Sequence, residues 1–243
     1  MVTCKVVTVL VPVGNLFLSS EYDAVPGGLR RVSPLPTVGQ SESEQRLTSP
    51  KPDITVEMKL RHSEIPQCGF AIDRLSDTVT PVICRPELVC PCFTLEAKGL
   101  ESAHFSTLQN THNAAHVVRN LESLRSTANS ADWGTNFYDH VVALSASITK
   151  DKVGIYGHWA SKGNGETEFY SRAMKTWTSE YEDYHEIHNW ISTAIFRLLE
   201  KNRPWIISDI EKVSQSSQQN SQSRSAPSTP PKTKTDLIYL SVT

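Results

Sequence analysis

The segment 92–125 constrains the fold more than any other part of the chain, because a strand pattern runs directly into a helix pattern. Apolar and polar side chains alternate over residues 92–98, which is typical of a half-buried strand, and Gly99 ends that pattern. Residues 101–125 then carry apolar side chains at spacings of three and four, as an amphipathic helix does. A strand that leads at once into a helix favours an α/β fold.

Further stretches of the chain show strand patterns. Residues 53–60 alternate strictly between polar and apolar side chains. Residues 141–148 and 153–159 are separated by a short polar turn and predict a hairpin, and residues 169–177 predict another strand. Together with the helix, these segments predict a mixed central sheet flanked by helices.

Composition predicts three regions along the chain. Residues 1–50 combine an apolar start with a linker rich in Pro and Ser, and within them only 6–18 has a pattern that suits an extra strand. Residues 51–213 carry the strand and helix patterns and predict one domain. Residues 214–243 are mostly Ser, Gln, Pro and Thr, which predicts a largely disordered C-terminal tail.

The last predicted helix covers residues 181–201. Its apolar side chains recur at helical spacing from Tyr184 to Leu198. Pro204 follows a few residues later, and a proline inside a helix removes a backbone hydrogen bond, so we expect the helix to end before it.

Charge and cysteine content narrow the possible classes of protein. The chain has 24 Lys and Arg against 26 Asp and Glu, a net charge of −2, and no apolar run long enough to predict a membrane-spanning helix or a convincing signal peptide. Its 5 cysteines are an odd number without framework spacing, which predicts reduced thiols and an intracellular location, nuclear or cytoplasmic. Cys90 and Cys92 stand too close together in sequence for the usual paired zinc ligands.

Four polar residues fall in a suggestive order on these elements. Asp53 follows a proline at the start of one strand, the triplet from Glu96 to Lys98 closes another strand, and Gln109 lies in the helix after it. This order resembles the signature of the PD-(D/E)XK, or restriction-endonuclease-like, nuclease superfamily. With KPDITV, FTLEAKG, IYGHW and a later Asn-Trp pair, the chain is most similar to nuclease-like domains of fungal proteins, over about residues 50–202.

The resemblance implies a restriction-endonuclease-like fold and a metal-dependent phosphodiesterase that acts on nucleic acid. Asp53 and Glu96 would hold Mg²⁺ or Mn²⁺, because Mg²⁺ binds one or two carboxylates and fills its octahedron with waters and phosphate oxygens. Lys98 would face the phosphate or the attacking water, and Gln109 would orient that water.

A second hypothesis is a protein that has the nuclease-like fold but no catalytic activity. Acid-x-Lys triplets are common, and Glu57 to Lys59 forms another. The side chains of Asp53, Glu96, Lys98 and Gln109 then serve as ordinary capping and surface groups. The net charge of −2 and a shortened N-terminal part favour an inactive module that binds a protein partner through the hairpin and the tail.

Two histidines offer a rival metal site. His112 and His116 lie one helical turn apart and can contact one ion. Metalloproteases with this spacing need Glu directly after the first His, where this chain has Asn113. We therefore expect both histidines to lie on the polar face of the helix.

Overall fold

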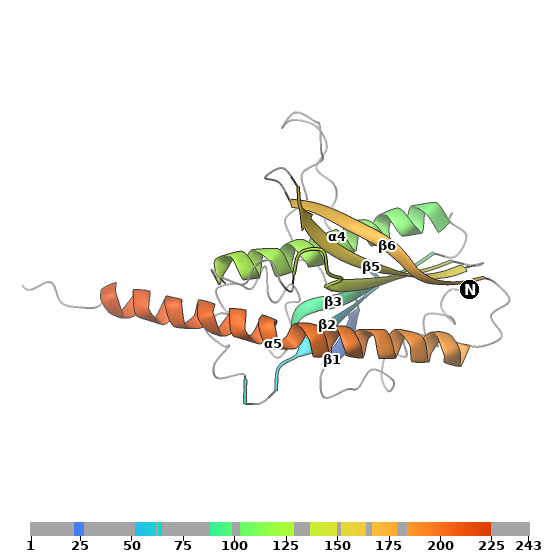
Figure 1. Cartoon of the computed structure of the whole chain (residues 1–243). Helices are drawn as coiled ribbons and strands as arrows, with labels where there is room; N and C mark the ends of the chain where they lie inside the picture. The colour runs from blue at the N-terminus through green and yellow to red at the C-terminus, as the bar shows by residue number, and fades with distance from the viewer. Residues whose placement is uncertain are drawn as a thin grey trace, which may run out of the picture.

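A six-stranded sheet forms the centre of the protein, in the spatial order β1-β2-β3-β4-β5-β6 (Figure 1). The computed structural model describes residues 22–26, 52–61, 63–64, 88–98, 103–128, 137–149, 152–163, 167–178 and 184–224. The strands are β1 (Tyr22–Pro26), β2 (Ile54–Lys59), β3 (Leu88–Ala97), β4 (Ala143–Ile148), β5 (Lys152–Lys162) and β6 (Thr167–Thr178). The helices are α4 (Ala103–Thr127) and α5 (Tyr184–Arg224).

The sheet is mixed, because β3 and β4 run parallel while every other neighbouring pair is antiparallel. Parallel neighbours need a crossover connection, and α4 supplies it between β3 and β4. Helix α4 lies on one face of the sheet and α5 on the other (Figure 1). The predicted α/β class, with helices flanking a mixed sheet, is confirmed.

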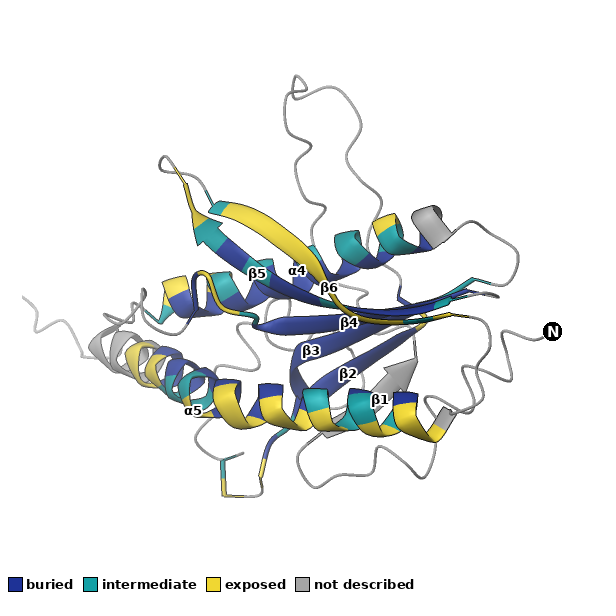
Figure 2. Ribbon diagram, turned by 45° about the vertical axis from the view of Figure 1, so that its right-hand side comes forward, coloured by how far each residue is buried: buried dark blue, intermediate teal, exposed yellow. Residues whose placement is uncertain are grey.

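The apolar core joins the sheet to α5 and to the second half of α4. On β2 and β3, Ile54 pairs with Leu95 and Val56 with Phe93, and all four side chains are buried. Ile187, Ile191 and Ile195 recur along one side of α5 and are buried as well. Figure 2 shows the matching pattern, with dark blue strands in the middle of the sheet and yellow residues on the outer side of α5.

Strand β3 begins earlier than its sequence pattern predicts. It starts at Leu88 instead of Cys92 and passes through Pro91, opposite Glu57 of β2. The pairing shifts register here, and Cys90 takes a positive φ of 49°, which L-residues other than Asn and Asp rarely adopt. This irregular pairing accommodates a proline that a regular ladder would exclude.

Helix α5 continues through Pro204, so the predicted stop is wrong. Beyond the proline, Ile206, Ile210 and Val213 are buried in the same core. Burial of three large side chains stabilises the fold by several kcal/mol, which outweighs the roughly 3 kcal/mol cost of an internal proline. Asp209, also buried, lies 3.8 Å from Arg125 of α4, which links the two helices.

Both predicted domain boundaries need correction. Ser214, placed at the start of the tail, is buried, and α5 runs on to Arg224. On the N-terminal side, β1 falls inside the predicted linker and pairs along its whole length with β2. The candidate strand 6–18 and the rest of the tail, 225–243, lie outside the described residues. Among the described residues, no helix is both long and apolar enough to cross a membrane.

Candidate active site

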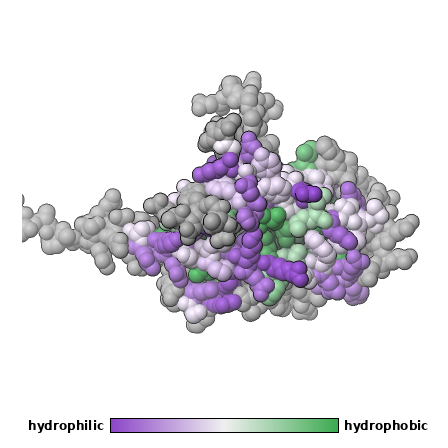
Figure 3. All heavy atoms as spheres, in the orientation of Figure 1, coloured by the Kyte–Doolittle hydropathy of each residue, from purple (hydrophilic) through white to green (hydrophobic). Residues whose placement is uncertain are grey.

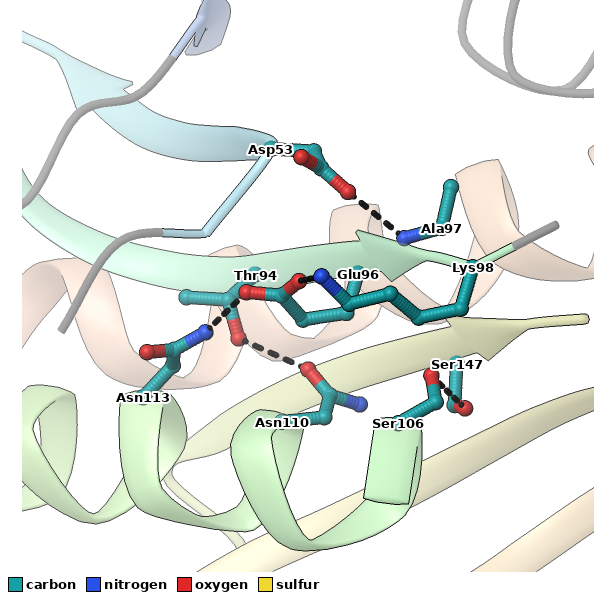
Figure 4. Close-up of polar contacts among 9 residues, drawn as sticks. All are labelled: Asp53, Thr94, Glu96, Ala97, Lys98, Ser106, Asn110, Asn113 and Ser147. Atoms are coloured by element: carbon teal, nitrogen blue, oxygen red, sulfur yellow. Dashed lines mark hydrogen bonds and ion pairs between the residues drawn. The ribbon is translucent and has the colours of Figure 1, made fainter. Parts of the chain in front are cut away.

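Asp53 and Glu96 meet because β2 begins where β3 ends. The backbone N–H of Asp53 donates to the carbonyl of Leu95 at 2.9 Å, which sets the antiparallel alignment of the two strands. The backbone N–H of Ala97 in turn donates to Asp53 Oδ2 at 2.7 Å (Figure 4). The structure therefore places Asp53 at the end of β3 next to Glu96 in the sheet, where its carboxylate is exposed and bonds to Ala97 while the carboxylate of Glu96 is buried and bonds to Asn113.

Glu96 points from β3 toward α4. Asn113 Nδ2 donates to Glu96 Oε1 at 2.6 Å, and the ammonium of Lys98 lies 3.7 Å from Glu96 Oε2 (Figure 4). Burial and the neighbouring charge of Asp53 raise the pKa of Glu96 to about 7, although Asn113 and Lys98 both act to lower it. Glu96 is consequently a carboxyl group that changes charge near neutral pH.

Lys98 lies on the solvent-exposed side of the site. Its backbone N–H donates to the carbonyl of Ile148 at 2.8 Å, so the residue is anchored where β3 and β4 end together. Its side chain is 23% exposed, against 1% for Glu96. A solvent-facing cation and a solvent-facing carboxylate, Asp53, therefore flank a buried carboxylate.

Asn113, not Gln109, is the residue of α4 that contacts Glu96. Both residues lie on α4, one turn apart, but the hydrogen bond to Glu96 comes from Asn113. Gln109 is half-buried, whereas Asn113 is fully buried. The signal that would have found Asn113 is the spacing of small polar residues at 106, 110 and 113, which marks the side of α4 that faces the sheet.

Those polar residues continue away from Glu96 as a layer of hydrogen bonds under α4. Thr94 Oγ1 lies 3.4 Å from Asn110 Oδ1, and Asn110 Nδ2 donates to Ser145 Oγ at 2.8 Å. Ser145 Oγ is 2.6 Å from His158 Nε2. Burial lowers the pKa of His158 to about 3, so this ring is neutral at physiological pH. The layer fixes the position of α4 over β3, β4 and β5.

Asp53 and Glu96 suit Mg²⁺ better than a transition metal. Within the described parts of the chain, no three His, Cys, Asp or Glu side chains gather closely enough to hold a metal ion. Mg²⁺ needs fewer protein ligands, since waters and phosphate oxygens complete its octahedron. Glu96 Oε2 is buried and accepts no hydrogen bond from the described residues, so the 3.7 Å ion pair with Lys98 leaves an oxygen that can bind a cation.

The histidine pair differs from its prediction. His112 and His116 do lie together, with ring centroids 4.8 Å apart in an edge-on arrangement. His116 is fully buried, so the expectation of two histidines on a polar, solvated face is wrong. Burial, with smaller contributions from His112 and Arg119, lowers the pKa of His116 to about 4 and keeps the ring neutral.

Comparison with known proteins identifies one family. Residues 17–219 match a domain of unknown function, DUF7924. The match includes β1 and extends beyond Pro204, in agreement with the two boundaries that the structure corrects. No curated protein and no solved structure matches the chain.

Proposed function

The chain belongs to the DUF7924 family, and we propose that it is a metal-dependent phosphodiesterase acting on nucleic acid, with Asp53 and Glu96 as ligands of Mg²⁺ or Mn²⁺. The observation that carries this proposal is the placement of Asp53, Glu96 and Lys98 at the adjacent ends of β2 and β3. Burial and, to a smaller extent, the charge of Asp53 raise the pKa of Glu96, and a bound cation would favour its charged form.

Each side chain has a distinct part in the proposed reaction. Mg²⁺ supplies a Lewis acid for the phosphoryl oxygen and lowers the pKa of a bound water. Asp53 and Glu96 hold the cation, and the hydrogen bond from Asn113 keeps the Glu96 carboxylate in place. Lys98, which is partly exposed, offers a positive charge to the substrate phosphate or the attacking water.

The substrate class and the location remain parts of the same proposal. A phosphodiester is the group that this combination of cation, carboxylates and ammonium suits, which is why nucleic acid is the proposed partner. Cys90 and Cys92 are buried cysteines in the reduced state, which supports the proposal of a reducing nuclear or cytoplasmic environment.

An inactive module is the second candidate, because both oxygens of Glu96 already interact within the protein. Asn113 contacts one oxygen and Lys98 the other, and the residue is buried. In this alternative Glu96 is a structural link between β3 and α4, like the neighbouring serines and asparagines. A protein partner would then be the ligand of the domain.

Cleavage and metal binding together separate the two candidates. We expect the protein to cleave generic single-stranded or double-stranded DNA or RNA with Mg²⁺ or Mn²⁺, and to melt at a higher temperature when either ion is added. Glu96→Gln, which keeps the acceptor for Asn113, is expected to lower cleavage at least about a hundredfold and to abolish the metal-dependent gain in melting temperature.

Matched variants refine this experiment. Lys98→Met is expected to slow cleavage while leaving the metal-dependent gain in melting temperature largely intact, because its role is toward phosphate. Glu200→Gln, an exposed change of the same type on α5, is the control and should behave like the wild type. Equal cleavage by wild type and Glu96→Gln, or no cleavage and no metal-dependent gain, would favour the inactive module.

A further inference from the structure

Strand β6 forms an outer edge of the sheet and is the most exposed of the strands with described side chains. Residues 168–176 are all exposed, in contrast to the buried residues of β2, β3 and β4 (Figure 2). Among the described strands β6 pairs with β5 alone, so its second side carries backbone N–H and C=O groups that face outward. Such an edge is a template for another strand.

The devices that usually protect an edge strand are weak here. Strand β6 is 12 residues long and contains no proline. Its register shift against β5 lies at Met174, between Ala173 and Lys175, which leaves residues 167–173 as a regular stretch. This stretch carries the exposed aromatic side chains of Phe169 and Tyr170, which are 36% and 42% exposed.

The two charges on the regular stretch have opposite signs and lie symmetrically about its centre. Glu168 is opposite Ser161 of β5 and Arg172 is opposite Gly157, four positions apart, so both side chains project from the same face of the sheet. Tyr170 lies midway between them. Its hydroxyl donates to the Glu168 carboxylate, and its ring stacks on Trp159 at 5.6 Å, which holds this part of the strand in order.

We propose that β6 pairs with β6 of a second copy of this chain, antiparallel and about a two-fold axis at Tyr170. A two-fold axis perpendicular to the sheet keeps each face on its own side and reverses the strand direction. Glu168 of one copy then lies opposite Arg172 of the other, and symmetry repeats this pair. The occupant of the edge is therefore a strand whose charges complement those of β6.

Neighbouring registers are less favourable. A two-fold axis at Glu168 would place two carboxylates opposite each other, and an axis at Arg172 would place two guanidinium groups opposite each other. Like charges directly opposite are destabilising. Axes at Phe169 or Ser171 place neither charge opposite its counterpart. The register at Tyr170 alone combines both unlike pairs, and it adds a cross-strand contact between two tyrosine rings.

The apolar surface next to β6 lies between the sheet and α5, outside the proposed pairing. Met174, which is 50% exposed, lies just beyond the regular stretch. Figure 3 shows apolar side chains gathered in the middle of the face on which β6 and α5 lie, with hydrophilic residues around them. The pairing uses neither Asp53, Glu96 nor Lys98, so it stands or falls independently of the proposed chemistry.

Charge reversal tests the proposed register. Sedimentation velocity of the full chain at increasing concentration is expected to show a dimer. Arg172→Glu opposes two carboxylates at each pair and Glu168→Arg opposes two guanidinium groups, so each variant alone is expected to be monomeric. An equimolar mixture of the two variants restores unlike pairs at both places, and we expect the dimer to return.

Two further results complete the test. Arg197→Glu makes the same change of charge on an exposed position of α5 and is expected to leave the dimer intact. Circular dichroism of each variant verifies that the fold is retained. A monomeric wild type at all concentrations, dimers in both single variants, or a mixture that stays monomeric would each overturn the proposal.

Discussion

The two sides of strand β3 near its C-terminal end are built from different chemistry. On the α5 face, Phe93 and Leu95 of β3 pack in an apolar core. On the α4 face, Thr94 and Glu96 of the same strand make hydrogen bonds to asparagines of the helix. Because side chains alternate along a strand, one ten-residue segment supplies both surfaces. We infer that the side of β3 facing α5 mainly stabilises the fold, whereas the side facing α4 positions Glu96.

A polar interior of this kind has an energetic consequence. Hydrogen bonds inside a protein replace hydrogen bonds to water, so their net contribution is about 1 kcal/mol each, whereas burial of a large apolar side chain contributes about 1.5–3 kcal/mol. A substitution that leaves a buried polar group without its hydrogen-bond partner is costly, however. The hydrogen bonds between β3 and α4 should therefore contribute less to the free energy of unfolding than the apolar contacts on the α5 face. Substitutions that remove only one partner of a buried hydrogen bond should be poorly tolerated.

The largest effect is expected for Phe93→Ala. Phe93 is 1% exposed, and truncation removes apolar contacts and leaves a cavity. We expect a loss of about 3–5 kcal/mol in the free energy of unfolding, measured by urea denaturation. Thr94→Ser, the neighbouring position on the other face, serves as the comparison and should cost less than half as much. Similar losses for both variants would refute the division between the faces.

Asn113→Ala is expected to have the next largest effect. It removes the donor at 2.6 Å from Glu96 Oε1 and leaves part of a buried carboxylate without a partner. Hydrogen bonds to charged groups contribute about 1.5–3 kcal/mol, and we expect a loss in that range in urea denaturation above pH 7, where Glu96 is ionised. Gln109→Ala, one turn away, is the control and should cost under about 0.5 kcal/mol. A larger loss for Gln109→Ala would contradict the assignment of the Glu96 hydrogen bond to Asn113.

A pH-dependent effect is expected for Glu96→Gln. Folding raises the pKa of Glu96 from 4.5 to about 7, so between these values the folded protein binds a proton that the unfolded chain releases. This contribution to stability is present below about pH 4.5 and is lost as the pH rises to about 7. Relative to wild type, Glu96→Gln should therefore gain stability between about pH 5 and about pH 8. Thermal unfolding curves of both proteins that shift in parallel with pH would contradict the raised pKa.

Much of the architecture was predictable from side-chain periodicity. The alternation over 53–60 and the helical spacing over 101–125 correspond to β2 and α4, because both patterns reflect which side of an element is buried. The end of α5 was not predictable in this way. Pro204 is a local signal to stop, but the buried Ile206 and Ile210 decide the outcome through contacts with distant parts of the chain.

The candidate site was predictable to a similar degree. The resemblance to the nuclease signature singled out Asp53, Glu96 and Lys98, and the antiparallel pairing of β2 with β3 explains why Asp53 lies at the end of β3. The choice between Gln109 and Asn113 depends on how α4 is rotated and shifted over β3, and those are tertiary quantities without a local pattern. The raised pKa of Glu96 depends in the same way on burial by α4.

The smallest expected effect concerns Ser106 and Ser147, whose hydroxyl groups lie 2.7 Å apart between α4 and β4. Both residues are buried, so Ser147→Ala leaves the Ser106 hydroxyl without this partner, and we expect a loss of about 1 kcal/mol. Adding Ser106→Ala removes the orphaned group. The double variant is therefore expected to be no less stable than either single variant in urea denaturation, with a coupling energy of about 1 kcal/mol. Additive losses would show that the two hydroxyl groups do not interact, and that each serine contributes to the free energy of unfolding on its own.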